Sequence, residues 1–327
     1  MIGRSGPGAV VALGGGHGLA ASLQALRHLT DRLTAVVTVA DDGGSSGRLR
    51  REFGVLPPGD LRMALSALCE DGEWGRLWRD VLQHRFHSTG PMDNHSLGNL
   101  LIVALWQRLE DPVAGLDWVG RLLGARGRVL PMAAVPLEIE ASVRGLDAAD
   151  PDAVRIVRGQ VAVAKTAGDV AEVHLVPRRP PACPEAVAAV RDADWVVLGP
   201  GSWFTSVLPH LMVPELAVAL HETSARRCVT MNLSAQAETR GLSAQAHLEV
   251  LADHAPGLTI DLVLADPSAV EDADALDRVA RRLGARLVMR QVGLGDGTAR
   301  HDALRLAAAY RDAFAGVVGD VVREAGR

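Results

Sequence analysis

A glycine-rich turn near the start of the chain has the residue types needed to hold a phosphate. Gly14, Gly15 and Gly16 follow a short apolar run, and Gly16-His17-Gly18-Leu19-Ala20-Ala21 fits the pattern G-x-G-x-x-A. Backbone without side chains can approach a phosphate closely, and a helix start offers free N–H groups and partial positive charge. We therefore predict phosphate or nucleotide binding at Gly14, Gly15, Gly16, His17 and Gly18. A strand-to-helix turn without a ligand is the simpler alternative.

Two adjacent carboxylates, Asp41 and Asp42, follow the next apolar run and could bind a ribose hydroxyl or Mg²⁺. They stand directly before Gly43, Gly44, Ser45, Ser46 and Gly47, a loop rich in N–H and hydroxyl donors. Neighbouring side chains on an extended segment point in opposite directions, so we expect only one carboxylate to face a ligand. We assign the metal-ligand role to Asp42. Capping of the glycine turn is the alternative.

A second glycine turn and a polar helix start complete the candidate set. Gly199, Pro200, Gly201 and Ser202 again follow an apolar run, and they suit a second anion site or simple helix capping. His95-Ser96-Leu97-Gly98-Asn99 combines polar side chains with a helix start. The sequence contains no zinc signature, no nucleophile elbow and no lysine-bearing phosphate loop.

The elements that position these turns follow the alternation of an α/β fold. Apolar runs at Ala9–Leu13, Thr34–Val39, Trp195–Leu198, Arg227–Leu233 and Ile260–Ala265 predict strands buried on both faces. Leu19, Leu23, Leu26 and Leu29 recur at helical spacing between the first two. We therefore predict a Rossmann-like, doubly wound and mostly parallel sheet.

Two insertions are predicted within a single domain covering residues 1–327. Residues 57–124 are helical, with helix starts at Pro58 and Ser96 and with Pro112 opening a further helix. Trp74, Leu77, Trp78, Val81 and Leu82 form another apolar helix face there. Residues 128–177 alternate as strands do, at 137–141, 158–163 and 170–176, which predicts a small antiparallel β subdomain.

Composition excludes several classes of protein. Hydrophobic residues make up 48% of the 327 residues, charged residues 22%, and the net charge is −5, so we expect a globular protein that does not bind nucleic acid. Three widely spaced cysteines form no disulfide framework or zinc site. No apolar run is long enough to span a bilayer, and we expect a cytoplasmic protein. Symmetric dimers are the commonest oligomers, so a homodimer is the expected assembly.

Several strings together resemble the gluconeogenesis factor family (YvcK type), which belongs to the wider CofD-like group of 2-phospho-lactate transferases. They are Gly14–Gly18, the run from Val39 to Arg48, Pro57-Pro58-Gly59-Asp60, His95–Asn99, Gly199–Ser202 and Thr205–Pro209. The resemblance extends from about residue 8 to residue 310. Arg300-His301-Asp302, followed by Leu306-Ala307, is similar to the family's RHD-x-x-KLA element.

The resemblance implies a cytoplasmic protein that binds UDP-activated sugars such as UDP-N-acetylglucosamine. It also implies a role in cell shape and cell-wall homeostasis during gluconeogenic growth, through an unidentified protein partner and without a settled catalytic activity or required cofactor. The two glycine turns, the Asp41–Gly47 loop, Asn99 and Asn232 are implied to contact the ligand, and Arg300 to bear on nucleotide-sugar binding. A bidentate guanidinium suits a diphosphate.

Departures from the family pattern concern sugar selectivity. His17 replaces a Thr or Ser, Trp203 and Phe204 replace Leu and Tyr, and the 232–239 segment is one residue shorter. Arg240 and Ala246 stand where acidic residues are usual. Two alternatives stay open: a Mg²⁺-dependent transferase acting on a nucleotide-activated phospho-acid, and, more remotely, a nicotinamide oxidoreductase suggested only by the glycine pattern.

Overall fold

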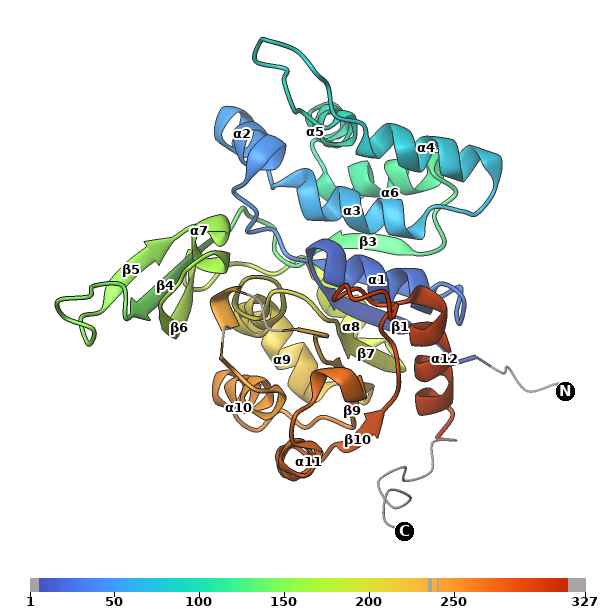
Figure 1. Cartoon of the computed structure of the whole chain (residues 1–327). Coiled ribbons are helices and arrows are strands. Elements are labelled where there is room, and N and C mark those ends of the chain that lie inside the picture. Colours follow the sequence, from blue (N-terminus) through green and yellow to red (C-terminus); the bar gives the residue numbers. More distant parts are fainter. Residues whose placement is uncertain (1–5, 235–236, 240, 317–327) are drawn as a thin grey trace, which may run out of the picture.

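A seven-stranded parallel sheet forms the centre of the molecule in the computed structural model, which describes residues 6–234, 237–239 and 241–316 (Figure 1). Its strand order is β10-β9-β8-β7-β1-β2-β3. The strands are β1 (Val10–Gly14), β2 (Leu33–Val37), β3 (Arg128–Pro131), β7 (Trp195–Leu198), β8 (Arg226–Thr230), β9 (Leu262–Ala265) and β10 (Arg286–Met289). The α/β fold with a mostly parallel sheet is therefore confirmed.

Burial explains why the central strands read as uninterrupted apolar runs. Every residue of β1 and of β7 is buried, because helices cover both faces of a parallel sheet. Helices α1 (Gly16–Leu26) and α12 (Ala303–Phe314) pack against each other, as do α8 (Pro184–Arg191) with α9 (Pro214–Glu222) and α10 (Ala244–His254) with α11 (Ala273–Arg282). Chain order reverses between β1 and β7, which makes this the switch point of the sheet.

The helical segment after β2 has the helix starts that the sequence predicts. It contains α2 (Gly44–Phe53), α3 (Pro58–Leu68), α4 (Glu73–Gln83), α5 (Leu97–Leu109) and α6 (Pro112–Leu122). Pro58 and Pro112 each occupy the first helical turn, where their missing N–H has no intrahelical partner to lose. The predicted apolar face of α4 is only partly buried: Leu82 is buried, whereas Trp74 and Leu77 are exposed.

The small antiparallel sheet has the order β5-β4-β6 and projects from the body of the molecule (Figure 1). Its strands are β4 (Glu138–Arg144), β5 (Arg155–Arg158) and β6 (Asp169–Val176), while β3 at residues 128–131 belongs to the main sheet. The predicted strand at 158–163 is wrong. Gly159 has a φ of 93°, the chain turns there, and Gln160–Ala164 form a short helix, α7.

Three further differences have local physical causes. After β7 the chain forms a π-helical turn, Trp203–Val207, because the Ser202 carbonyl accepts hydrogen bonds from both Ser206 and Val207. The strand predicted to reach Leu233 ends at Thr230. Strand β10 is not predicted from the sequence, because it is short, lies at the edge of the sheet and is only partly buried.

No single helix among the described residues is long and apolar enough to cross a membrane, although one bent pair, Trp203–Met212 with Pro214–Glu222, passes by length and composition.

The C-terminal helix α12 is fixed to the sheet by a buried phenol. The Tyr310 hydroxyl lies 3.1 Å from Ser22 Oγ on α1 and 2.8 Å from Thr230 Oγ1 on β8. Burial raises the pKa of Tyr310, so it acts only as a neutral hydrogen-bonding group. The hydroxyl therefore connects α1, β8 and α12.

Replacement of Tyr310 by Phe should lower the free energy of unfolding by about 1–2 kcal/mol, because two buried hydroxyls lose their partner. Urea denaturation measures the change. Leu304→Ala, on the same helix but 70% exposed, is the matched control and should change stability little. Equal stability of Tyr310→Phe and wild type would contradict a stabilising role of this contact.

Candidate functional site

The two predicted glycine turns lie in direct contact at the switch point of the sheet. The first follows β1 and the second follows β7, and these strands pair in parallel. A Cβ atom at Gly18 would lie only 1.9 Å from the Pro200 carbonyl oxygen. No side chain fits at Gly18, so backbone groups of both turns converge at the carboxyl ends of β1 and β7.

The first turn places the start of α1 at the carboxyl end of β1. Gly15, which has no side chain to cap the helix, is the N-cap in an extended conformation, and Gly16 has a φ of 57°. Gly16 forms a backbone hydrogen bond with the Asp60 carboxylate. His17 is exposed on the turn. A helix start that follows a parallel strand binds anions in other α/β proteins, and here the Asp60 carboxylate accepts the Gly16 N–H.

Two polar side chains hold the second turn. Asn232, which follows β8, accepts a hydrogen bond from Gly201 N at 2.7 Å and donates to Gly201 O at 2.8 Å. Ser202 Oγ donates to Glu238 Oε1 at 2.5 Å, and Phe204 N donates to the same oxygen at 3.1 Å. Asn232 therefore supports the turn, and both of its amide groups are occupied by Gly201.

Glu238 is a buried carboxylate that sequence reasoning missed. It is 4% exposed, burial raises its pKa, and its Oε2 has no hydrogen-bond partner among the described residues. No sequence signal could have revealed it, because its hydrogen-bond partners, Ser202 and Phe204, lie 36 and 34 residues away in the sequence. The neighbouring Arg240 lies outside the described residues.

Asp41 and Asp60 form a pair of converging carboxylates beneath the first glycine turn. A Cβ atom at Gly15 would lie 2.5 Å from Asp60 Oδ2, and one at Gly59 would lie 2.5 Å from Asp41 Oδ2. Burial, assisted by the charge of Asp41, raises the pKa of Asp60 to about 7. Burial likewise raises the pKa of Asp41, against hydrogen bonds from Gly43 N and Ser46. The pair is poised to take up a proton or a cation.

Asp60 was part of a recognised helix start but was not predicted as a site residue. Its position in the sequence was the available signal. Asp60 lies in the first turn of α3, directly after Pro57-Pro58-Gly59.

Asp42 points away from this pair, as strand alternation predicts. Its Oδ1 accepts a hydrogen bond from Val161 N at 3.1 Å, and a Cβ atom at Gly159 would lie 2.1 Å from its Oδ2. Asp42 therefore caps α7 and connects the small sheet to the Gly43–Gly47 loop. In the described part of the chain, no group of three or more His, Cys, Asp or Glu side chains could hold a metal on its own.

The serines of the Gly43–Gly47 loop are held by buried hydrogen bonds. Ser46 Oγ accepts from Gly59 N at 3.0 Å. Ser45 Oγ accepts from Asn99 Nδ2 at 3.1 Å and lies 3.1 Å from His95 Nδ1. Gly43, the N-cap of α2, donates its N–H to Asp41 Oδ1 at 2.9 Å, and Ser45, Ser46 and Gly47 in the first turn of the helix are buried. Asn99 thus positions the loop from inside.

Arg62, which sequence reasoning did not select, anchors Asn99. Its Nε donates to Asn99 Oδ1 at 2.9 Å and one of its terminal nitrogens donates to Gln83 Oε1 on α4. Burial, assisted by Arg85, lowers the pKa of Arg62 to about 10, and it remains cationic at neutral pH. The orientation of the Asn99 amide, with its nitrogen toward Ser45, follows from this contact.

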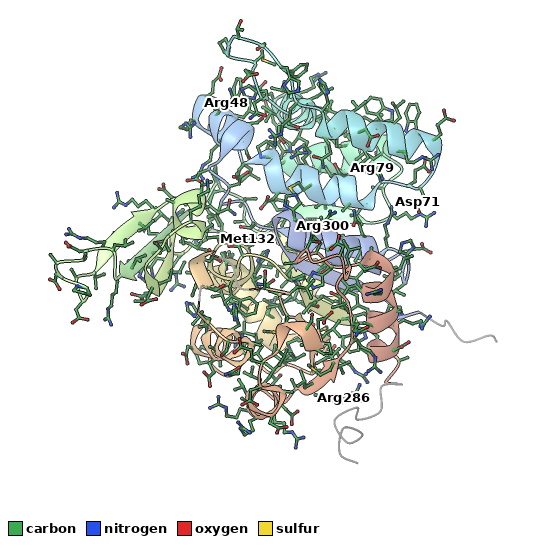
Figure 2. The ribbon with its side chains drawn as sticks, viewed as in Figure 1. Arg48, Asp71, Arg79, Met132, Arg286 and Arg300 are labelled. Atoms are coloured by element: carbon green, nitrogen blue, oxygen red, sulfur yellow. The ribbon has the colours of Figure 1, made fainter. Side chains whose placement is uncertain are left out.

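Arg300 lies on a separate loop along the same edge of the sheet, and its side chain is exposed (Figure 2). The loop is anchored because Asp266 Oδ2 accepts from Val292 N and Gly293 N, and Leu294 N donates to Arg300 O. Gly293 in turn lies against Leu233, the neighbour of Asn232. None of the contacts of the described residues joins Arg300 directly to a glycine turn.

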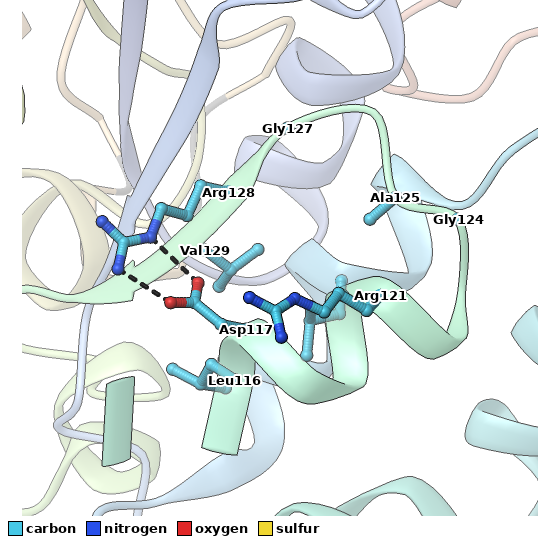
Figure 3. A pocket seen from close by; sticks show the side chains of 10 residues that line it. Leu116, Asp117, Arg121, Gly124, Ala125, Gly127, Arg128 and Val129 are labelled. Atoms are coloured by element: carbon cyan, nitrogen blue, oxygen red, sulfur yellow. Dashed lines mark hydrogen bonds and ion pairs between the residues drawn. The ribbon is translucent and has the colours of Figure 1, made fainter. Parts of the chain in front are cut away.

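A pocket of about 340 Å³ elsewhere in the molecule contains none of the predicted site residues (Figure 3). It lies beside the start of β3, at the amino end of the parallel strands. Arg128 and Asp117 form a bidentate ion pair across it at 2.9 and 2.8 Å. The paired charges satisfy each other, so this pocket is not the candidate site.

Comparison with known proteins places the chain in a family. The family model for 2-phospho-L-lactate transferase CofD matches residues 10–289. A putative gluconeogenesis factor of Mycobacterium tuberculosis is 54% identical over 314 residues, covering 95% of this chain and 91% of that protein. The gluconeogenesis factor of Bacillus subtilis is 34% identical over 264 residues and 80% of each chain.

A solved structure has the same fold over nearly its whole length. It is a Bacillus halodurans protein described as a member of the UPF0052 family, with 32% identity and a TM-score of 0.81, covering 92% of this chain and 98% of that one. From these similarities and the matched family model, the chain belongs to the gluconeogenesis factor family within the wider CofD family.

Proposed function

We propose that the chain is a cytoplasmic binding protein for a UDP-activated sugar such as UDP-N-acetylglucosamine, with a regulatory role in cell shape and cell-wall homeostasis under gluconeogenic growth. The contact between the two glycine turns carries the proposal, because it brings backbone groups at the ends of β1 and β7 together beside the start of α1. Backbone N–H groups at a helix start can bind a phosphate. The ligand then biases an as yet unidentified protein partner.

The charges around the site support a diphosphate ligand accompanied by Mg²⁺. Mg²⁺ usually binds one or two carboxylates together with phosphate oxygens and water. Asp41 and Asp60 converge at the first turn and would hold the ion, while Asp42 is engaged by α7. The cation would neutralise phosphate charge next to the two acids.

The second candidate function is a transferase of the phospho-lactate type. The matched family model and the carboxylate pair favour it, since phosphoryl transfer depends mainly on positioning and charge neutralisation. The relatives named gluconeogenesis factors, at 34–54% identity, favour the binding protein.

Replacement of Arg300 by Ala should weaken binding of UDP-N-acetylglucosamine by about 1.5–3 kcal/mol, because a charge-assisted contact with the ligand is lost. Isothermal titration calorimetry measures the affinity. Arg281→Ala, an exposed arginine on α11 paired with Asp277, is the control and should bind like wild type. No heat with UDP-sugars, together with strong heat from a guanylylated phospho-acid and Mg²⁺, would favour the transferase instead.

Replacement of Asp41 by Asn should abolish the Mg²⁺ dependence of ligand binding, whereas Asp42→Asn should retain it, since only Asp41 converges on Asp60. Titrations of UDP-N-acetylglucosamine with and without Mg²⁺ compare the two variants, and melting curves establish that both are folded. If only Asp42→Asn lost the Mg²⁺ dependence, Asp42 and not Asp41 would be the metal ligand.

The raised pKa of Asp60 predicts a pH dependence of stability. The folded state keeps a proton that the unfolded chain releases near pH 3.8, so the free energy of unfolding should fall as pH rises toward about 7. Asp60→Asn should flatten this decline, measured by urea denaturation across that range. The exposed control Asp152→Asn should keep the wild-type slope, and an equally steep decline in Asp60→Asn would show that other groups cause it.

A further inference from the structure

A pocket of about 430 Å³ lies between helix α2 and the loop that joins α4 to α5. It contains no residue of the two glycine turns, and it shares none with the pocket beside β3. Three charged side chains of α2 and two residues of the loop form its walls. We call this the α2 pocket, and its lining residues are Arg48, Arg51, Glu52, Pro91 and His95.

The His95 ring is held firmly in the wall of the α2 pocket. Its side chain is only 7% exposed, its backbone N donates to Met92 O at 3.0 Å, and its carbonyl accepts from Phe86 N at 3.0 Å. Nδ1 lies 3.1 Å from Ser45 Oγ in the interior. Nε2, which points away from Ser45, has no hydrogen-bond partner among the described residues and is not closed off from solvent. The pocket is therefore where Nε2 can find a partner.

The hydrogen bonds around Ser45 determine which nitrogen of His95 carries the proton. A guanidinium only donates, so the Arg62 contact makes Asn99 Oδ1 an acceptor and leaves Asn99 Nδ2 to donate to Ser45 Oγ. Ser96 N also donates to Ser45 Oγ, at 3.2 Å. These two donors occupy both acceptor positions of the hydroxyl, so Ser45 donates its own proton to His95 Nδ1. The neutral ring then carries its proton on Nε2.

The electrostatics of His95 agree with this arrangement. Burial, assisted by the charge of Arg48, lowers its pKa against an opposing effect of Glu52, so the ring is neutral at pH 7. A protonated ring would have to donate from Nδ1 to an oxygen whose lone pairs are already occupied. His95 Nε2–H is therefore a fixed hydrogen-bond donor at the pocket wall.

The α2 pocket carries more positive than negative charge. Arg48, labelled in Figure 2, donates to Pro91 O at 3.0 Å and to Asp93 O at 2.7 Å, so it fastens the loop to α2 and keeps its charge. Arg51 is exposed, and the described residues give its guanidinium no partner. Glu52 is the one acidic lining residue. Two cations and a neutral N–H donor favour an oxyanion as the occupant.

We propose that the α2 pocket binds a small organic oxyanion, a carboxylate or a phosphate monoester, through His95 Nε2–H and the Arg51 guanidinium. The aliphatic stems of the two arginines and the Pro91 ring would pack against its uncharged part. The volume is within the range of small-molecule pockets. This is a second site, separate from the one proposed for the UDP-sugar, and its occupant would extend the hydrogen-bond chain that ends at Ser45 and His95.

Nuclear magnetic resonance of protein labelled with ¹⁵N in the histidine rings tests the donor and the ligand class. At pH 7 the His95 ring should carry its proton on Nε2, and its signals are assigned by their loss in His95→Gln. Phenyl phosphate and benzoate are the probes for a phosphate monoester and a carboxylate. At least one should shift the Nε2 resonance saturably, and the tighter probe identifies the anion. Inorganic phosphate should bind about tenfold more weakly than that probe, because it has no apolar part.

The contribution of Arg51 is tested with the tighter probe. Arg51→Gln should weaken its binding about tenfold, because a charge-assisted contact is lost. Arg108→Gln, an exposed arginine on α5, is the matched control and should bind like wild type. Melting curves establish that the variants are folded. A proton on Nδ1 of His95 overturns the proposal. So does the lack of a saturable shift with both probes, equal binding of inorganic phosphate, or unchanged binding in Arg51→Gln.

Discussion

The close approach of the Gly18 backbone to the Pro200 carbonyl is the constraint on which the site depends. It requires β1 and β7 to be neighbours, a first turn without a side chain and a second turn held in place. Asn232 meets the last requirement by binding both polar groups of Gly201. The start of α1 and Asp60 beside it are then fixed relative to both turns, so a change at the switch point would reach both glycine turns and Asp60.

Much of this could be predicted from the sequence because its causes are local. Strands buried on both faces are apolar along nearly their whole length, so β1, β2 and β7 could be predicted from their apolar runs. The glycine turns could also be predicted, since positive φ values and close backbone contact exclude other residue types at these positions. The divergence of Asp41 from Asp42 follows from the alternation of an extended chain.

The rest could not be predicted because it depends on contacts between distant segments. An alternating apolar pattern after Arg158 suits a strand, yet the chain turns at Gly159 and forms a short helix there. Asp42, more than a hundred residues earlier, accepts a hydrogen bond from Val161 N in that helix. Glu238 and Arg62 are charged residues whose burial is determined only by the groups around them. Asp60 differs, because its position after two prolines and a glycine was visible, but its proximity to Asp41 was not.

The helical segment does more than cover the sheet, because its hydrogen bonds hold the Gly43–Gly47 loop in place. Gln83 on α4 accepts from Arg62, Arg62 donates to Asn99, and Asn99 donates to Ser45. Arg62 is a buried cation that donates to two amide oxygens and lies near the charges of Asp60 and Asp41. Loss of either amide would leave a buried donor unsatisfied, so these residues respond as a unit. A surface contact on α4 is therefore three hydrogen bonds from the loop. The geometry of the Gly43–Gly47 loop therefore depends on the packing of α4.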